Sequence, residues 1–163
     1  MKQQLDHDEV SLHIEASAEA LYDIVSDVTR TPELSPEVLK CTWLDGATGP
    51  AVGARFEATN KAGRSPAWKN RPEVIVADRG REFTISRTEK AAGTIVWRYR
   101  FEPQGSGTLV TESYEVIEPI TAMGWFVIGT LYGNHDRRAG LRQGMTQTLE
   151  RLREVAERST TGG

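Results

Sequence analysis

The sequence has little of what points directly to a chemistry. Cys41 is the only cysteine among 163 residues, which excludes an internal disulfide and a thiol redox pair. The histidines His7, His13 and His135 match no triad and no metal-ligand spacing. We therefore expect no metal and no cofactor. A single cysteine also fits a reducing compartment, so we expect a cytoplasmic protein.

The chain also lacks a strong excess of charge of one sign. The net charge is -3, with acidic and basic residues scattered along the chain, so we expect no nucleic-acid partner. A local basic patch is still conceivable at Arg79, Arg81 and Arg87. The polar N-terminal residues lack the apolar core of a signal peptide.

Long hydrophobic runs are absent too. The longest uncharged segment, residues 119–135, is interrupted by Gly124, Gly129 and Gly133 and falls short of the roughly 20 apolar residues of a spanning helix. We therefore expect no transmembrane segment. Three roles remain for this segment. It is part of the core, a contact surface for a dimer or a membrane, or the wall of a cavity.

Hydrophobic periodicity predicts a strand, two helices, six further strands and a long helix. Residues 9–15 alternate as a half-buried strand does, and Ser17 is placed to cap a helix. The two prolines of 31–36 predict a second, short helix. Glycine-rich linkers then separate strands expected at 38–45, 53–61, 68–78, 81–88, 94–102 and 108–118. Residues 136–158 predict an amphipathic C-terminal helix.

These elements predict an α+β fold. The short linkers join antiparallel neighbours, so we expect one seven-stranded, curled antiparallel sheet wrapped around the long C-terminal helix. The two short helices lie between the first and second strands. A chain of this length favours a single domain, here residues 1–158, followed by a flexible tail at 159–163.

The order of elements resembles the helix-grip fold of the START-like, or SRPBCC, superfamily. Local motifs are similar to its bacterial polyketide cyclase/dehydrase branch, and they are "IEASAEALYDIVSDV" (14–28), "SPEV" (35–38), "WLDGATGPAVGARF" (43–56), "WRYRFEPQGSGTLVTESYE" (97–115) and "GMTQTLERLREVAE" (144–157). The resemblance implies a deep apolar cavity between the sheet and the last helix. The superfamily includes lipid carriers, hormone and flavonoid binders and aromatic cyclases, and no catalytic motif transfers residue by residue.

Strand alternation predicts which side chains face this cavity. Trp97, Tyr99 and Phe101 share one face, with Arg98 and Arg100 on the other. The other side chains expected to point inward are Phe56, Ala58, Trp68, Val74, Val76, Phe83 and Ile85. For residues 108–118 the preferred inward set is Val110, Glu112, Tyr114 and Val116, and the alternative set is Leu109, Thr111, Ser113 and Ile117.

Glu112 is the best candidate for a general acid or base, because an apolar cavity would raise the pKa of its carboxyl group. The alternative is a solvated carboxylate, or one paired with Arg87 or Arg100. The hydroxyl groups of Tyr99 and Tyr114 suit hydrogen bonds to a phenolic or polyketide ligand, whereas their alternative role is core packing. Cys41 has no neighbour in the sequence that would activate its thiol.

The C-terminal helix and the segment before it supply the remaining candidates. Gly140 and Gly144 either allow a close approach to a strand or leave volume for a ligand beside Met145. Arg137 either meets an anionic ligand group at the cavity mouth or is solvated. His135 with Asp136 is either an acid/base pair or a polar helix start. Residues 119–135, with Trp125 and Tyr132, are expected to form a flap over the cavity.

Three functions follow from these features. The first is binding of a hydrophobic, lipid-like or polyketide-like small molecule in the cavity. The second is cyclisation or dehydration of a polyketide-like substrate, with Glu112, Tyr114 and Arg137 as candidate catalytic residues. The third is a protein-interaction module that uses the 119–135 flap, and homodimer formation is the simplest form of such an interaction.

Overall fold

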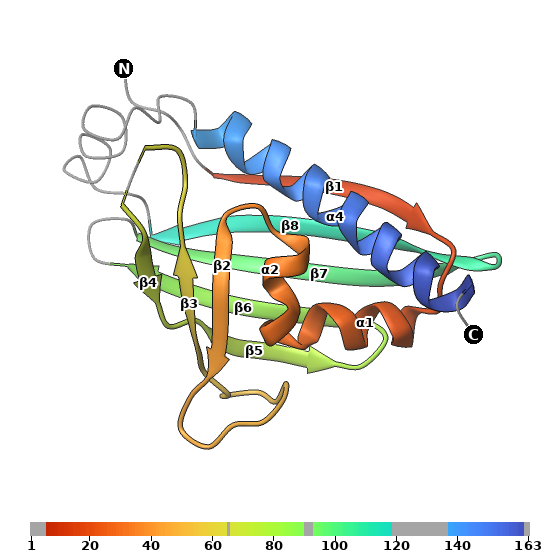
Figure 1. Ribbon diagram of the computed structural model, residues 1–163, viewed down its shortest axis with the longest axis horizontal. Coiled ribbons are helices and arrows are strands. Elements are labelled where there is room, and N and C mark those ends of the chain that lie inside the picture. Colours follow the sequence, from red (N-terminus) through yellow and green to blue (C-terminus); the bar gives the residue numbers. More distant parts are fainter. Residues whose placement is uncertain (1–5, 65, 90–92, 119–136, 162–163) are drawn as a thin grey trace.

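The computed structural model describes residues 6–64, 66–89, 93–118 and 137–161, and it shows an α+β fold (Figure 1). Helices cover one face of a five-stranded antiparallel sheet, and a three-stranded antiparallel sheet crosses the strands of the larger sheet on the same side (Figure 1). The expected combination of a mostly antiparallel sheet and a long C-terminal helix is therefore confirmed.

The N-terminal elements follow their sequence signals. Strand β1 covers His7–Ile14 and helix α1 covers Ala18–Ser26. The hydroxyl oxygen of Ser17 accepts a hydrogen bond from the backbone N–H of Ala20 at 3.1 Å, which confirms the predicted cap. A 3-10 turn, η1 (Val28–Arg30), leads into the short helix α2 (Thr31–Leu34), which has a proline in its first turn.

The strands form two sheets instead of the predicted single seven-stranded one. The smaller sheet has the order β2-β3-β4, with β2 at Val38–Trp43, β3 at Phe56–Asn60 and β4 at Trp68–Asn70. The larger sheet has the order β1-β8-β7-β6-β5, with β5 at Glu73–Asp78, β6 at Glu82–Glu89, β7 at Gly93–Gln104 and β8 at Gly107–Glu118.

Pro72 explains the difference. The predicted strand 68–78 is divided into β4 and β5, and Pro72 lies between them, where its missing N–H prevents a continuous ladder. The two sheets still adjoin here, because Phe56 N–H donates to the Pro72 carbonyl at 3.2 Å and Val74 N–H donates to the Ala54 carbonyl at 2.8 Å. At this bend the chain passes from the smaller sheet back to the larger one.

Helix α4 covers Arg137–Thr161 among the described residues and continues past the predicted end at 158 into the expected tail. Residues 162 and 163 lie outside the described residues. One face of α4 is buried, through Leu141, Met145, Leu149, Leu152 and Ala156. The Arg142 guanidinium also binds the Asp8 carboxylate at 2.7 Å, which ties α4 to β1.

The buried apolar residues form two separate clusters. The larger one contains most of α1 and the inward residues of both sheets, including Phe56, Phe83 and Phe101. The smaller one contains Ile95, Tyr114, Leu141 and Met145. Within the part of the chain that the structure describes, no helix has the length and apolarity needed to cross a lipid bilayer.

Candidate ligand cavity

A cavity lies between the two sheets and α4 and is bordered by both apolar clusters. The volume of this cavity is about 150 Å³. Its apolar lining is Val25, Val28, Leu34, Val38, Cys41, Phe56, Ala58, Pro72, Phe83, Ile85, Trp97, Leu141 and Met145. An apolar wall with a few polar groups is the usual composition of a small-molecule site.

The structure places most of the described candidate ligand-binding residues on this cavity. Those that line it are Phe56, Phe83, Trp97, Tyr99, Gly144 and Met145. Val74 is instead completely buried in the larger cluster, and Tyr114 packs in the smaller one with its ring 5.3 Å from that of Trp97. Trp68 is half-buried in β4, opposite Asn60. Trp125, Tyr132 and the rest of the expected flap lie outside the described residues.

Strand β8 turns the preferred set of side chains inward. Val110, Glu112 and Tyr114 are at most 3% exposed, whereas Ile117 of the alternative set is 56% exposed. The preferred interpretation of this strand is therefore confirmed. The physical reason is that strict alternation along an unbroken strand leaves only two choices, and this one buries a tyrosine and a valine.

The Glu112 carboxyl group is buried against the cavity and has a tyrosine as its partner. The Tyr99 hydroxyl donates a hydrogen bond to Glu112 Oε1 at 2.9 Å. Burial raises the pKa of Glu112 to about 8, although the hydrogen bond from Tyr99 opposes this rise. Burial, and then the neighbouring Glu112, raise the pKa of Tyr99 well above its usual value. At neutral pH the carboxyl group is therefore largely protonated.

The predicted alternative for Glu112, a pair with an arginine, is wrong. Arg98 and Arg100 instead contact Glu82 on the outer face of the sheet, at 3.3 Å and 3.7 Å. Within the described part of the chain, the pKa of Glu112 is set by burial and by Tyr99, and no arginine contributes to it. The same alternation that turns Glu112 inward turns the two arginines of β7 outward.

Both glycines of α4 line the cavity and face open space. A Cβ atom added at Gly140 or at Gly144 would meet no heavy atom of the described residues within 4 Å. Close approach to a strand therefore does not explain them, and the interpretation that they leave free volume is the one that fits. One turn further along, the Thr148 hydroxyl donates to the Gly144 carbonyl at 2.8 Å.

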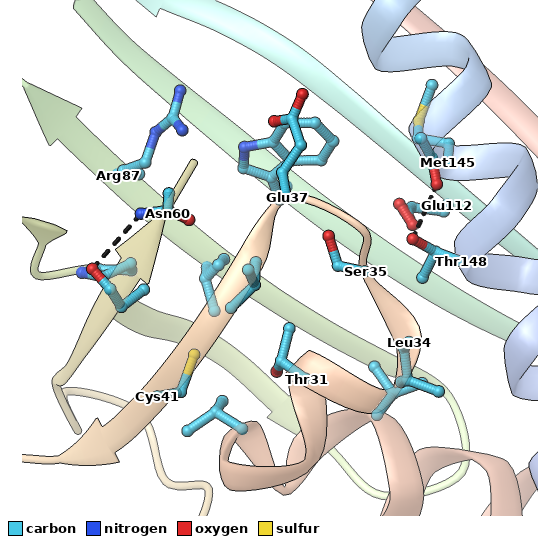
Figure 2. Close-up of a pocket in the computed structure, with 18 of the residues that line it drawn as sticks. Thr31, Leu34, Ser35, Glu37, Cys41, Asn60, Arg87, Glu112, Met145 and Thr148 are labelled. Atoms are coloured by element: carbon cyan, nitrogen blue, oxygen red, sulfur yellow. Dashed lines mark hydrogen bonds between the residues drawn. The ribbon is translucent and has the colours of Figure 1, made fainter. Parts of the chain in front are cut away.

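Several polar side chains on the cavity were not predicted. They come from the α2 to β2 segment, from β3 and β4, and from β6, and they are Thr31, Ser35, Glu37, Asn60, Asn70 and Arg87. Figure 2 shows Arg87 and Asn60 together at one side of the cavity, away from Glu112 and Thr148 beside α4. Thr31 and Ser35 lie between these two sides in the same view.

Arg87 was detectable from the sequence. It has the same strand phase as Phe83 and Ile85, which were predicted to point inward, so alternation along β6 also places Arg87 inside. The predicted basic patch with Arg79 and Arg81 does not include it. The Arg79 guanidinium instead binds both carboxylate oxygens of Asp23, at 2.9 Å and 2.7 Å.

The remaining candidate residues contribute no further reactive group to the described part of the site. Cys41 is buried on the cavity wall, and burial raises the pKa of its thiol to about 11, so the thiol is neutral as expected. Arg137 begins α4, but its side chain, like His135 and Asp136, lies outside the described part of the chain. Among the described residues, no three metal-ligating side chains are grouped around a common point.

Comparison with known proteins assigns this architecture to a family. The family profile described as "Polyketide cyclase / dehydrase and lipid transport" matches residues 7–157. The chain belongs to this family. It is thus a member of the START-like superfamily, as its motifs indicated.

Solved structures agree with the assignment. A polyketide-cyclase-like protein of Corynebacterium glutamicum is 35% identical, with 93% of this chain and 91% of that chain covered and a TM-score of 0.60. The di-domain ARO/CYC protein StfQ of the steffimycin biosynthetic pathway is 16% identical with a TM-score of 0.74, and 95% of this chain matches 51% of StfQ. Major latex-like protein 151 of Panax ginseng is 13% identical, with 92% and 96% covered and a TM-score of 0.68. The last two show likeness of fold alone, and no curated protein matches this chain.

Proposed function

We propose that this protein binds a mainly apolar small molecule, of a lipid-like or polyketide-like kind, in the cavity between the sheets and α4. The observation that carries the proposal is the pair of α4 glycines that face open space, Gly140 and Gly144. Each glycine destabilises a helix interior by about 1 kcal/mol relative to alanine. Larger side chains at these two positions would fit into the space beside α4 and would stabilise the helix. A bound molecule that occupies this space explains why both positions are glycine.

The chemistry of the lining suits such an occupant. Phe83, Trp97 and Met145 offer apolar contact area, and aromatic rings and a thioether adapt to flat or irregular shapes. Tyr99 and Glu112 supply hydrogen-bonding groups at one place on this wall. The family, described as polyketide cyclase / dehydrase and lipid transport, supports the same class of ligand, as does the similarity to a polyketide-cyclase-like protein and to an ARO/CYC protein.

The test is to fill the gap with Gly144→Leu. The variant should remain folded, because leucine is a far better helix former than glycine and its Cβ meets open space. It should lose binding in a thermal-shift screen with lipids and aromatic polyketides, whereas Gln143→Leu, on the exposed side of α4, should bind like the wild type. The proposal fails if the wild type binds nothing in native mass spectrometry and in the screen, or if Gly144→Leu binds equally well.

A second candidate function is acid/base catalysis on the bound molecule, as in cyclisation or dehydration of a polyketide-like chain. The observation that favours it is the buried Glu112 carboxyl group, whose pKa of about 8 lies near physiological pH. A group with such a pKa exchanges protons efficiently in either direction at neutral pH. Protonated Glu112 would donate to a carbonyl or a departing hydroxyl, and Tyr99 would hold the carboxyl group in position.

Glu112→Gln separates the two functions. The amide keeps the shape of the side chain and an acceptor for the Tyr99 hydroxyl, but it does not transfer a proton at neutral pH. Catalysis predicts that turnover of a polyketide-like substrate is lost while binding persists. Unchanged turnover would eliminate Glu112 as the catalytic group, and a protein that binds without any turnover would leave only the binding function.

A further inference from the structure

We propose that the cavity selects ligands with two different polar ends, an acidic group held by Arg87 and a neutral hydrogen-bonding group held by Glu112 and Tyr99. This inference rests on the proposed binding function and adds the chemical class of the ligand. It starts from two groups of polar side chains in the lining, Arg87 with Asn60 at one side of the cavity and Glu112 with Tyr99 at the other.

The strand register separates the two places. Glu112 of β8 pairs with Tyr99 of β7, and Tyr99 pairs with Phe83 of β6, so these three residues lie at one level of the sheet. Arg87 lies four residues further along β6, which corresponds to about 13 Å along the strand. It is also two strands away from Glu112, or about 10 Å sideways.

Both side chains line the cavity from these backbone positions. A molecule that contacts both therefore has to be on the order of 10 Å long, given these spacings and the reach of the side chains. The wall between them includes the apolar side chains of Ile85 and Trp97. The fitting ligand thus has a flat or chain-like apolar body with a polar group near each end.

The two ends differ in charge. The guanidinium of Arg87 is charged at every physiological pH and presents five N–H donors in a planar fork that matches a carboxylate, sulfonate or phosphate. The amide of Asn60 lies beside it in Figure 2. Glu37 also lines the cavity, is partly buried, and lies between Arg87 and Glu112 in Figure 2.

The Glu112 end suits a neutral group. Here the polar atoms are a carboxyl group and a phenol hydroxyl that already bind each other at 2.9 Å, deep in the protein. A carbonyl or a hydroxyl joins this pair without a net charge, whereas a second acid would crowd two carboxyl groups in an apolar place. The expected orientation therefore has the acidic end at Arg87.

Two fluorescent probes with one skeleton test this assignment. 8-Anilinonaphthalene-1-sulfonate is an anion, and N-phenyl-1-naphthylamine has the same rings without the sulfonate. The wild type should bind the sulfonate more tightly than the neutral amine. Arg87→Met should weaken sulfonate binding about tenfold or more, as expected for loss of a charge-assisted hydrogen bond, and change binding of the neutral probe by less than about twofold.

Controls locate the effect. Arg81→Met removes an exposed arginine of the β5 to β6 turn and should change neither affinity, whereas Arg87→Lys, which keeps the charge, should fall between wild type and Arg87→Met. Gly144→Leu should exclude both probes from the cavity. Binding of the neutral probe also reports that each Arg87 variant is folded.

The possible results separate this inference from the binding function itself. If neither probe binds the wild type, or if Gly144→Leu binds both, the proposed function fails. If both probes bind in the cavity but the wild type prefers the neutral amine, the assignment of an acidic ligand end is overturned. It is equally overturned if Arg87→Met weakens both probes by the same factor. The wild-type preference decides the question even if an Arg87 variant does not fold.

Discussion

The buried carboxyl group of Glu112 should make the stability of this protein depend on pH in an unusual direction. Its pKa is about 8 in the folded state, against the ordinary value of 4.5 that an unfolded chain has. The folded state therefore holds the proton more tightly than the unfolded state. Stability from this group is fully present below the unfolded pKa and is lost as the pH rises through the folded pKa.

The magnitude follows from the two pKa values. Each unit of difference corresponds to about 1.4 kcal/mol, so the full effect is roughly 5 kcal/mol. Most of the loss falls in the window between the two values, and about 3 kcal/mol of it should occur between about pH 5 and about pH 8. This is a large part of the free energy of unfolding of a typical domain, about 5–15 kcal/mol.

Glu112→Gln isolates the contribution of this one group. The glutamine does not titrate, so it lacks the pH dependence, while other groups contribute equally to both proteins. Urea denaturation at several pH values gives the free energy of unfolding of each protein. The wild type minus Glu112→Gln difference should decrease by about 3 kcal/mol from about pH 5 to about pH 8. A difference that stays constant over this range would refute the argument that burial keeps the carboxyl group protonated.

Three further predictions concern the fold. Gly107→Ala should lower the free energy of unfolding by about 1–3 kcal/mol in urea denaturation, because the added Cβ would collide with the Ile14 carbonyl oxygen. The control Gly49→Ala places its Cβ in open space and should have little effect, so equal effects of the two substitutions would contradict this account. Ser17→Ala should lower the free energy of unfolding by about 1 kcal/mol in the same assay, because it removes the hydrogen bond that caps α1. The control Ser17→Thr keeps a hydroxyl group and should be close to the wild type. An unchanged free energy of unfolding in Ser17→Ala would argue against the cap. Gly140→Ala should raise the melting temperature by stabilising α4 by about 1 kcal/mol, and a lower melting temperature would mean that space at this position is not free.

Local patterns predicted most of the fold. The alternation in residues 9–15, the cap at Ser17 and the apolar stripe of α4 each correspond to an element near its predicted place. The one large error, a single sheet, concerned the stretch that contains Pro72. Apolar and polar residues alternate in the same way before and after such a bend. The pattern therefore does not show that β4 and β5 belong to different sheets.

The site was predictable only in part. Strand phase identified four residues that line the cavity, because side chains on the inner face of a curled sheet point toward its interior. These residues are Phe56, Phe83, Trp97 and Tyr99. Strand phase does not distinguish cavity wall from packed core: Val74 and Tyr114 were also predicted to bind the ligand, and the structure places them in the two buried clusters. That distinction depends on which side chains from distant elements meet.

The sequence by itself determined which residues form strands and helices, which face of each is apolar, and that Glu112 shares a face with Val110 and Tyr114. These properties depend on spacing along the chain. Only the tertiary structure decided that the Tyr99 hydroxyl is the partner of Glu112 and that Gly140 and Gly144 face open space. Such contacts join residues far apart in sequence, and they are set by how the sheets and α4 pack in three dimensions.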